Sequence, residues 1–171
     1  AGIVQLAEAV PVFLRPGSET LKFTPDELAA CITNKTKWLI LNSPSNPSGV
    51  GYMAADLMAI AEVLRQHSQV YVICDDIYEH LTYGDFTFAA LAAVAPDLQS
   101  RVVTLNGVSK SYCMTGWRIG YCTAPPDLIK AMAKVQSQST SSPNSIAQWA
   151  AIAALDGPID FIADNCRAFA A

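Results

Sequence analysis

Short apolar runs alternate along this chain with segments whose apolar residues recur every three or four positions. The runs predict β-strands, and the periodic segments predict amphipathic α-helices. Strands are expected at residues 10–14, 37–41, 70–74, 101–105 and 119–123. Helices are expected from Thr24 onward, at 54–66, within 86–95, from about 127 to 135 or beyond, at 146–155 and over 159–171. This alternation is typical of an α/β domain in three layers (α/β/α), with helices on both faces of a mostly parallel sheet.

Local signals support two of these elements. Thr24 precedes Pro25 and Glu27, which is the pattern of a capping box with proline in the first helical position. Residues 37–41 are nearly all apolar, as expected for a strand whose two faces are both covered.

The composition is unusually apolar. Of 171 residues, 51% are apolar and 15% are charged, whereas globular domains carry about 25% charged residues. This excess indicates either a well-buried core or a surface that further polypeptide or a partner subunit covers. We expect the second, because residues 1–9 lead into a strand without a start signal and residues 159–171 stop within a helical pattern.

The charge and the cysteine content argue against several classes of protein. The net charge of −4 and the lack of a basic run argue against nucleic acid as the main partner. No apolar run approaches the roughly 18 residues of a membrane span, and no signal peptide is visible. Five cysteines without CxxC spacing predict reduced thiols in a cytoplasmic protein. With only two scattered histidines, no metal site is expected.

Polar residues follow the three central strands. Asn46 lies in the proline-rich loop after the first of them, Asp75 and Tyr78 follow the second, and Lys110 lies in the loop after the third. Arg118 comes just before the last strand. Because ligands bind at the carboxyl ends of parallel strands, we expect these five side chains to converge on one site.

The chemistry of this set suits one cofactor. A deprotonated lysine is a nucleophile, and arginine is a permanently charged, bidentate phosphate ligand. A carboxylate can pair with a cationic ring nitrogen, while tyrosine and asparagine can hydrogen-bond a phenolic oxygen. Together these groups describe a pyridoxal 5′-phosphate site.

Each residue also has an ordinary structural explanation. Taken singly, Lys110 would be a solvated loop lysine, Asn46 a turn former, Asp75 a loop cap, Tyr78 a core residue and Arg118 a salt-bridge residue. One cofactor site accounts for all five. The apolar strand that ends in two acids also resembles the magnesium-binding strand of phosphate-loop nucleotidases, but the required Gly-Lys-Ser/Thr loop is missing.

Three motifs resemble those of a known family. Residues 107–110 (Gly-Val-Ser-Lys) and 114–120 (Met-Thr-Gly-Trp-Arg-Ile-Gly) resemble the cofactor-attachment signature of class I aminotransferases. Residues 42–49 resemble their Asn-Pro-Ser/Thr-Gly loop, and residues 75–78 their Asp-x-x-Tyr segment. The resemblance is closest to the bacterial aspartate aminotransferase branch. It implies the large domain of the fold-type I pyridoxal phosphate transferases, in which the last strand, about 119–123, is antiparallel.

The resemblance also implies roles. Lys110 would be the catalytic residue, which holds the cofactor covalently and moves a proton during transfer. Asp75 would keep the pyridine nitrogen protonated. Tyr78 and Asn46 would hydrogen-bond the 3′ oxygen of the cofactor, and Arg118 would bind its phosphate.

Two further features follow from the resemblance. Ser109 would assist in phosphate binding. The polar segment 136–142 resembles one that reaches towards the site of the neighbouring subunit, so a homodimer is expected. The implied substrates are an amino acid similar to aspartate and a 2-oxo acid, which exchange an amino group by a ping-pong mechanism.

Members of this family are more than twice as long as this chain. Residues 1–171 would therefore be the central part of the large domain, without the N-terminal cofactor loop and the small domain, and inactive alone. Two alternatives stay open. The same core residues would serve a β-lyase or related fold-type I enzyme, or a non-catalytic module that senses pyridoxal phosphate.

Overall fold

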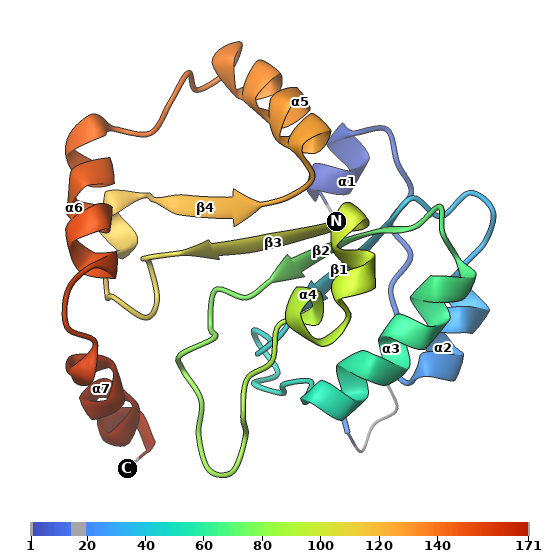
Figure 1. Ribbon diagram of the computed structural model, residues 1–171, viewed down its shortest axis with the longest axis horizontal. Helices are drawn as coiled ribbons and strands as arrows, with labels where there is room; N and C mark the ends of the chain where they lie inside the picture. Colours follow the sequence, from blue (N-terminus) through green and yellow to red (C-terminus); the bar gives the residue numbers. More distant parts are fainter. Residues whose placement is uncertain (1, 15–19, 171) are drawn as a thin grey trace.

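A four-stranded sheet lies at the centre of the computed structural model, which describes residues 2–14 and 20–170 (Figure 1). The strands run in the order β1 (Trp38–Asn42), β2 (Tyr71–Asp75), β3 (Val102–Gly107) and β4 (Gly120–Thr123). The first three are parallel, and β4 pairs with β3 in the antiparallel direction. The sequence predicted each of these strands to within one or two residues, and the antiparallel direction of the last is confirmed.

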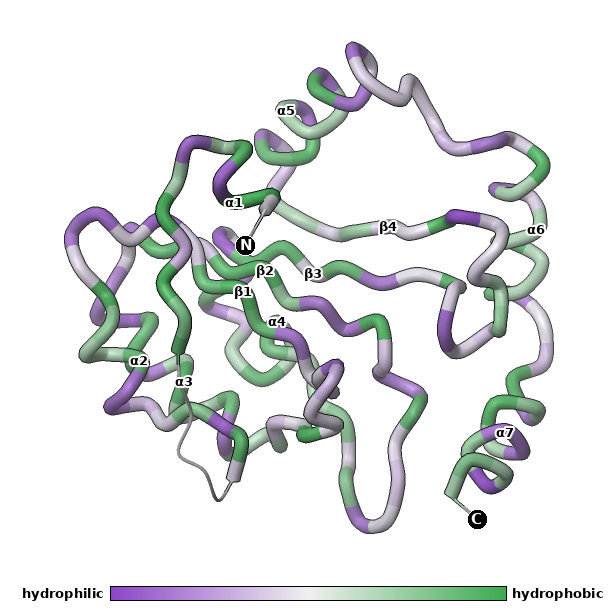
Figure 2. The backbone as a smooth tube through the Cα atoms, turned by 180° about the vertical axis from the view of Figure 1, so that it is seen from behind, coloured by the Kyte–Doolittle hydropathy of each residue, from purple (hydrophilic) through white to green (hydrophobic). Residues whose placement is uncertain are grey.

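Three helices cover one face of this sheet: α2 (Pro25–Cys31), α3 (Ala54–Gln66) and α4 (Leu91–Val94). Alternate residues of β1 and β2 point into the core between sheet and helices. Both strands are mostly apolar (Figure 2), because the residues on the other face are largely apolar as well. The fully buried side chains of this core include Leu57, Ile60, Leu64, Leu91 and Val72. Each contributes about 1.5–3 kcal/mol of burial free energy.

Helix α2 begins as its sequence predicts. The Thr24 hydroxyl accepts a hydrogen bond from the Glu27 backbone N–H (3.2 Å), and the Glu27 carboxylate accepts one from the Thr24 N–H (2.7 Å). The capping box is therefore confirmed.

Arg101 closes the carboxyl end of α3 and the turn after it. This residue ends the 3₁₀ helix η1 (Pro96–Arg101). Its guanidinium donates to three backbone carbonyls, those of Leu64 (2.6 Å), Val70 (2.7 Å) and His67 (3.0 Å). Carbonyls at a helix end have no intrahelical partner, so one side chain fixes the approach to β2.

The opposite face of the sheet is largely exposed over β1 and β2. Trp38 and Tyr71 pack side by side there with ring centroids 5.2 Å apart, and Ile40 next to them is 56% exposed. A three-layer α/β/α domain places helices on this face too. Within residues 2–14 and 20–170 that cover is incomplete, which agrees with the expectation that apolar surface of this chain is buried by further polypeptide or a partner.

The prediction of a strand at residues 10–14 is wrong. These residues have no regular structure, and they follow a short helix, α1 (Gly2–Leu6). Val10, Val12 and Phe13 are mostly exposed. An apolar run forms a strand only when a neighbouring strand supplies its hydrogen bonds, and none pairs with this segment in the described part of the chain.

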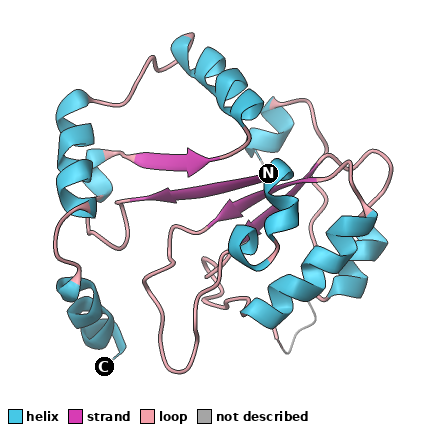
Figure 3. Cartoon of the chain, viewed as in Figure 1, coloured by secondary structure: helices cyan, strands magenta, loops and turns pink. Residues whose placement is uncertain are grey.

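Three helices form the C-terminal part, as expected: α5 (Pro126–Ser137), α6 (Ser145–Leu155) and α7 (Asp160–Ala170). Figure 3 shows them arranged around the β4 side of the molecule. No single described helix is long and apolar enough to cross a membrane; α6 and α7 reach that length only together and are bent by 87°. The helix expected within 86–95 is confirmed only over the four residues of α4.

Candidate functional site

The carboxyl ends of β1 and β2 lie next to each other. Asn42, the last residue of β1, pairs in register with Asp75, the last residue of β2. The next backbone N–H, that of Asp76, donates to the Leu105 carbonyl of β3 (2.9 Å). The loops that follow these strands therefore start from one edge of the sheet, as the sequence predicted.

Asn46 and Tyr78 meet at this edge, although 32 residues separate them. The Asn46 side-chain amide donates to the Tyr78 hydroxyl over 3.2 Å. Tyr78 comes from the long loop between β2 and α4 (Figure 3), and Asn46 from the proline-rich loop after β1. Asn46 is exposed and Tyr78 is half-buried, so both polar groups can reach a ligand.

Lys110 joins this pair. Its ammonium nitrogen lies 5.8 Å from the centre of the Tyr78 ring. The loop that carries it is anchored on both sides, because Val108 and Ser111 are buried while Lys110 itself is exposed. The structure thus brings together Asn46, Tyr78 and Lys110, and places Asp75 at the end of the adjoining strand.

Ser109 is half-buried beside Lys110. In the part of the chain that the structure describes, its side chain makes no hydrogen bond to another predicted site residue. Ser109 lies near the other residues only because it directly precedes Lys110 in the chain.

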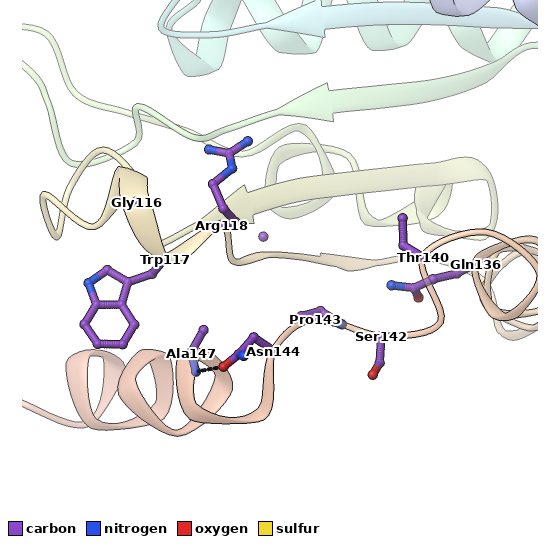
Figure 4. A pocket seen from close by; sticks show the side chains of 10 residues that line it. Gly116, Trp117, Arg118, Gln136, Thr140, Ser142, Pro143, Asn144 and Ala147 are labelled. Atoms are coloured by element: carbon purple, nitrogen blue, oxygen red, sulfur yellow. Dashed lines mark hydrogen bonds between the residues drawn. The ribbon is translucent and has the colours of Figure 1, made fainter.

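Arg118 lies in a separate part of the same loop. It follows the 3₁₀ helix η2 (Thr115–Trp117) with a left-handed backbone (φ 56°), and its guanidinium donates to the Thr115 carbonyl (3.1 Å). It lines an open pocket of about 730 Å³ together with Gln136 in the last turn of α5 and with Thr140 and Ser142 of the polar segment that follows. In Figure 4 the Arg118 side chain points away from Trp117 and from the start of α6.

The two adjacent acids after β2 differ in environment. Asp75 is half-buried, and its carboxylate accepts a hydrogen bond from the Ile77 N–H (3.4 Å). Asp76 is buried, and this burial, with smaller contributions from the charges of Glu79 and Asp75, raises its pKa to about 7. Of the two carboxylates, that of Asp75 is the one accessible to a ligand.

Sequence reasoning did not single out Asn42. Its side-chain amide donates to the Asp75 carbonyl (3.0 Å), and its side-chain oxygen accepts from the Asn46 N–H (2.9 Å). The signal was a polar residue that closes an otherwise apolar strand. In a sequence, that pattern does not distinguish a strand end from a functional contact.

Other groups at this edge are structural. Asn106, near the end of β3, donates to the Glu79 carboxylate (2.6 Å) and accepts from the Gly107 N–H (2.7 Å). Burial raises the pKa of the Cys74 thiol to about 12, so this cysteine packs in the core as a neutral group. Among the described residues, no three His, Cys, Asp or Glu side chains form a metal-binding group.

The sequence matches a model of the family "Aminotransferase class I and II" over residues 2–169. It is 55% identical to an aspartate/prephenate aminotransferase of Cereibacter sphaeroides, over 98% of this chain and 42% of that relative. It is 50% identical to an aspartate aminotransferase of Rhizobium meliloti, over 98% of this chain and 41% of that protein. The chain therefore spans about 42% of the length of the curated relatives it matches.

Solved structures agree with these matches. A crystal structure of the Rhizobium meliloti aspartate aminotransferase superposes with a TM-score of 0.96 at 49% identity, over 98% of this chain and 42% of that one. A Thermus thermophilus aspartate aminotransferase with maleate gives a TM-score of 0.82 at 40% identity, over 98% and 41%. The predicted family resemblance and its mixed α/β fold are both confirmed.

Proposed function

Because this chain belongs to the class I and II aminotransferase family, we propose that it is the central part of the large domain of an aminotransferase. The whole protein would move an amino group between an amino acid similar to aspartate and a 2-oxo acid by a ping-pong mechanism. The observation that carries the proposal is the grouping of Asn46, Tyr78 and Lys110 beside Asp75 at one edge of the sheet.

The cofactor would be pyridoxal 5′-phosphate, and the donor set fits it. The grouped residues offer an exposed amine, an amide hydrogen-bonded to a hydroxyl, and an accessible carboxylate. The exposed guanidinium of Arg118 belongs to a separate part of the loop that carries the amine. When bound, the cofactor supplies a ring that withdraws electrons from the substrate Cα. Side chains of the protein would carry out all other steps.

Each side chain would have a defined task. The amine of Lys110 attaches the cofactor and then carries a proton to and from the substrate Cα. The carboxylate of Asp75 accepts the hydrogen bond of the protonated ring nitrogen. Asn46 and Tyr78 donate to the phenolic oxygen. The guanidinium of Arg118 binds the phosphate as a charged, bidentate partner.

Ser109 would donate its hydroxyl to the same phosphate. Its place directly before Lys110 supports this role. In addition, the last turn of α5 and the polar segment after it line the pocket of Arg118, so Gln136, Thr140 and Ser142 would contribute further polar contacts there.

The assembly would be a cytoplasmic homodimer that binds neither membrane nor nucleic acid. Supporting the dimer, Ile146 and Trp149 of α6 are 71% and 70% exposed, and large apolar groups left in water on one helix favour association. The chain by itself would be inactive, since it accounts for only 42% of the length of its relatives.

Borohydride reduction tests the proposal. The full-length protein that contains this chain is treated with pyridoxal phosphate, reduced and digested, and the labelled peptide is identified by mass spectrometry. We expect the label on Lys110, and we expect Lys110→Ala to lose the label and about 10²–10⁴-fold in transamination of aspartate with 2-oxoglutarate.

The matched control is Lys130→Ala, which removes an exposed lysine of α5. This variant should keep both label and activity. A label that stays after Lys110→Ala would disprove the assignment of Lys110. Turnover of cystathionine in place of aspartate would instead favour a β-lyase.

A further inference from the structure

Asn42 makes two hydrogen bonds that tie separate loops of the site together. Its amide nitrogen donates to the backbone carbonyl of Asp75 (3.0 Å), and its side-chain oxygen accepts from the backbone N–H of Asn46 (2.9 Å). The ladder places Asn42 directly beside Asp75. An amide side chain is suited to this position because it carries a donor nitrogen and an acceptor oxygen on the same carbon.

A continuous row of hydrogen bonds results. It runs from Asp75 through the Asn42 amide to the backbone of Asn46, and from the Asn46 side chain to the Tyr78 hydroxyl (3.2 Å). Asn46 is exposed, so little packing fixes it. The Asn42 bond is thus a principal restraint on where the Asn46–Tyr78 pair lies relative to the end of β2.

The rest of the proline-rich loop has anchors of its own. The Tyr52 N–H donates to the buried Ser43 hydroxyl (2.9 Å), and the Ser45 N–H donates to the Val50 carbonyl (2.9 Å). The Asp75 carbonyl also accepts from the Ser43 N–H (3.3 Å). Loss of the Asn42 side chain would therefore loosen Asn46 while leaving the loop folded.

We propose that Asn42 is a positioning residue, which sets the distance between the Asn46–Tyr78 pair and Asp75 so that both can engage the same bound ring. This inference rests on the proposed function, in which the pair donates to the phenolic oxygen and Asp75 accepts from the ring nitrogen. The side-chain bonds of Asn42 go to the backbone of Asp75 and of Asn46, and not to the side-chain groups that would meet the ring. Asn42 acts through the two loops that it holds.

The test uses Asn42→Ala in the full-length protein that contains this chain. The dissociation constant for pyridoxal phosphate should rise about tenfold, the usual size of a lost supporting contact. The pH midpoint of the absorbance change of the bound cofactor should also shift, because the donors to its phenolic oxygen are displaced. Asn42→Asp preserves the shape but cannot donate to the Asp75 carbonyl, so it should weaken binding too.

Thr24→Ala is the control for stability. It removes the capping bond of α2 and should cost a comparable amount of stability without touching the site. We expect its pyridoxal phosphate affinity and pH midpoint to equal those of the wild type. If this control shifts both quantities as Asn42→Ala does, the effect is one of general stability and the inference is wrong.

A double-mutant cycle with Asn46→Ala separates positioning from an independent role. If Asn42 acts through Asn46, adding Asn42→Ala to Asn46→Ala should weaken cofactor binding by less than about twofold. Full multiplication of the two effects would contradict the inference. If the wild type binds no pyridoxal phosphate at Lys110, the proposed function fails; if it binds and Asn42→Ala binds equally well with the same midpoint, only this inference fails.

Discussion

Gly107 is the residue at which β3 leaves the sheet towards the Lys110 loop, and it pairs in register with Gly120 of β4. A Cβ atom added at Gly107 would lie 2.9 Å from the Ile119 carbonyl oxygen and 3.2 Å from the Gly120 Cα. The Ile77 Cδ1 atom, also at 3.2 Å, can rotate away, but these two backbone atoms cannot. We predict that Gly107→Ala forces the two strands apart.

The size of the effect follows from these contacts. Ordinary contact begins at 3.4 Å, so the strands must separate by about 0.5 Å (3.4 − 2.9). Overpacking of this kind costs about 1–3 kcal/mol. The substitution also lowers the conformational entropy of the unfolded chain, which stabilises the folded state by about 0.4–1 kcal/mol. With the middle of each range, about 2 and about 0.7 kcal/mol, the net loss in the free energy of unfolding should be about 1.3 kcal/mol.

Urea denaturation of the full-length protein measures this loss as a lower midpoint at constant slope. Gly116→Ala is the matched control in the same loop, because an added Cβ there meets nothing within 4 Å. The control should unfold at the wild-type midpoint or slightly above it. Equal midpoints for Gly107→Ala and Gly116→Ala would refute the reasoning.

Two further predictions concern stability. The pKa of Asp76 rises from 3.8 to about 7 on folding, mainly through burial. Protonated Asp76 stabilises the fold fully below about pH 4, and this contribution is lost as the pH rises through 7. At pH 8 the free energy of unfolding of Asp76→Asn should therefore exceed that of the wild type by up to about 4 kcal/mol. An unchanged pH profile of unfolding would contradict this. Arg101→Ala should destabilise the protein by about 2–4 kcal/mol, because three carbonyls lose their charged donor; a calorimetric shift no larger than that of Thr24→Ala would count against it.

The sequence by itself predicted all four segments that form the sheet and the loops that follow them. Apolar runs bounded by proline and polar residues left few alternatives for β1, β2 and β3. The capping box at Thr24 is a local signal that needs only four residues. The motifs around Lys110 identified the family, because their residue types and spacing recur together.

Other features depended on contacts between distant residues. The apolar run at 10–14 reads like a strand, but a strand requires a partner, and hydrophobicity does not supply one. Asp75 and Asp76 are equivalent in sequence, and only packing buries one and leaves the other accessible.

The hydrogen bond from Asn42 to Asp75 was likewise hidden, since it joins residues 33 positions apart. Which face of the sheet is covered also followed only from the placement of α2, α3 and α4. Local propensity and periodicity depend on residues that are close together in the sequence. Pairing, burial and hydrogen-bond partners come from segments that meet only after folding, and these decide how the residues of the site act together.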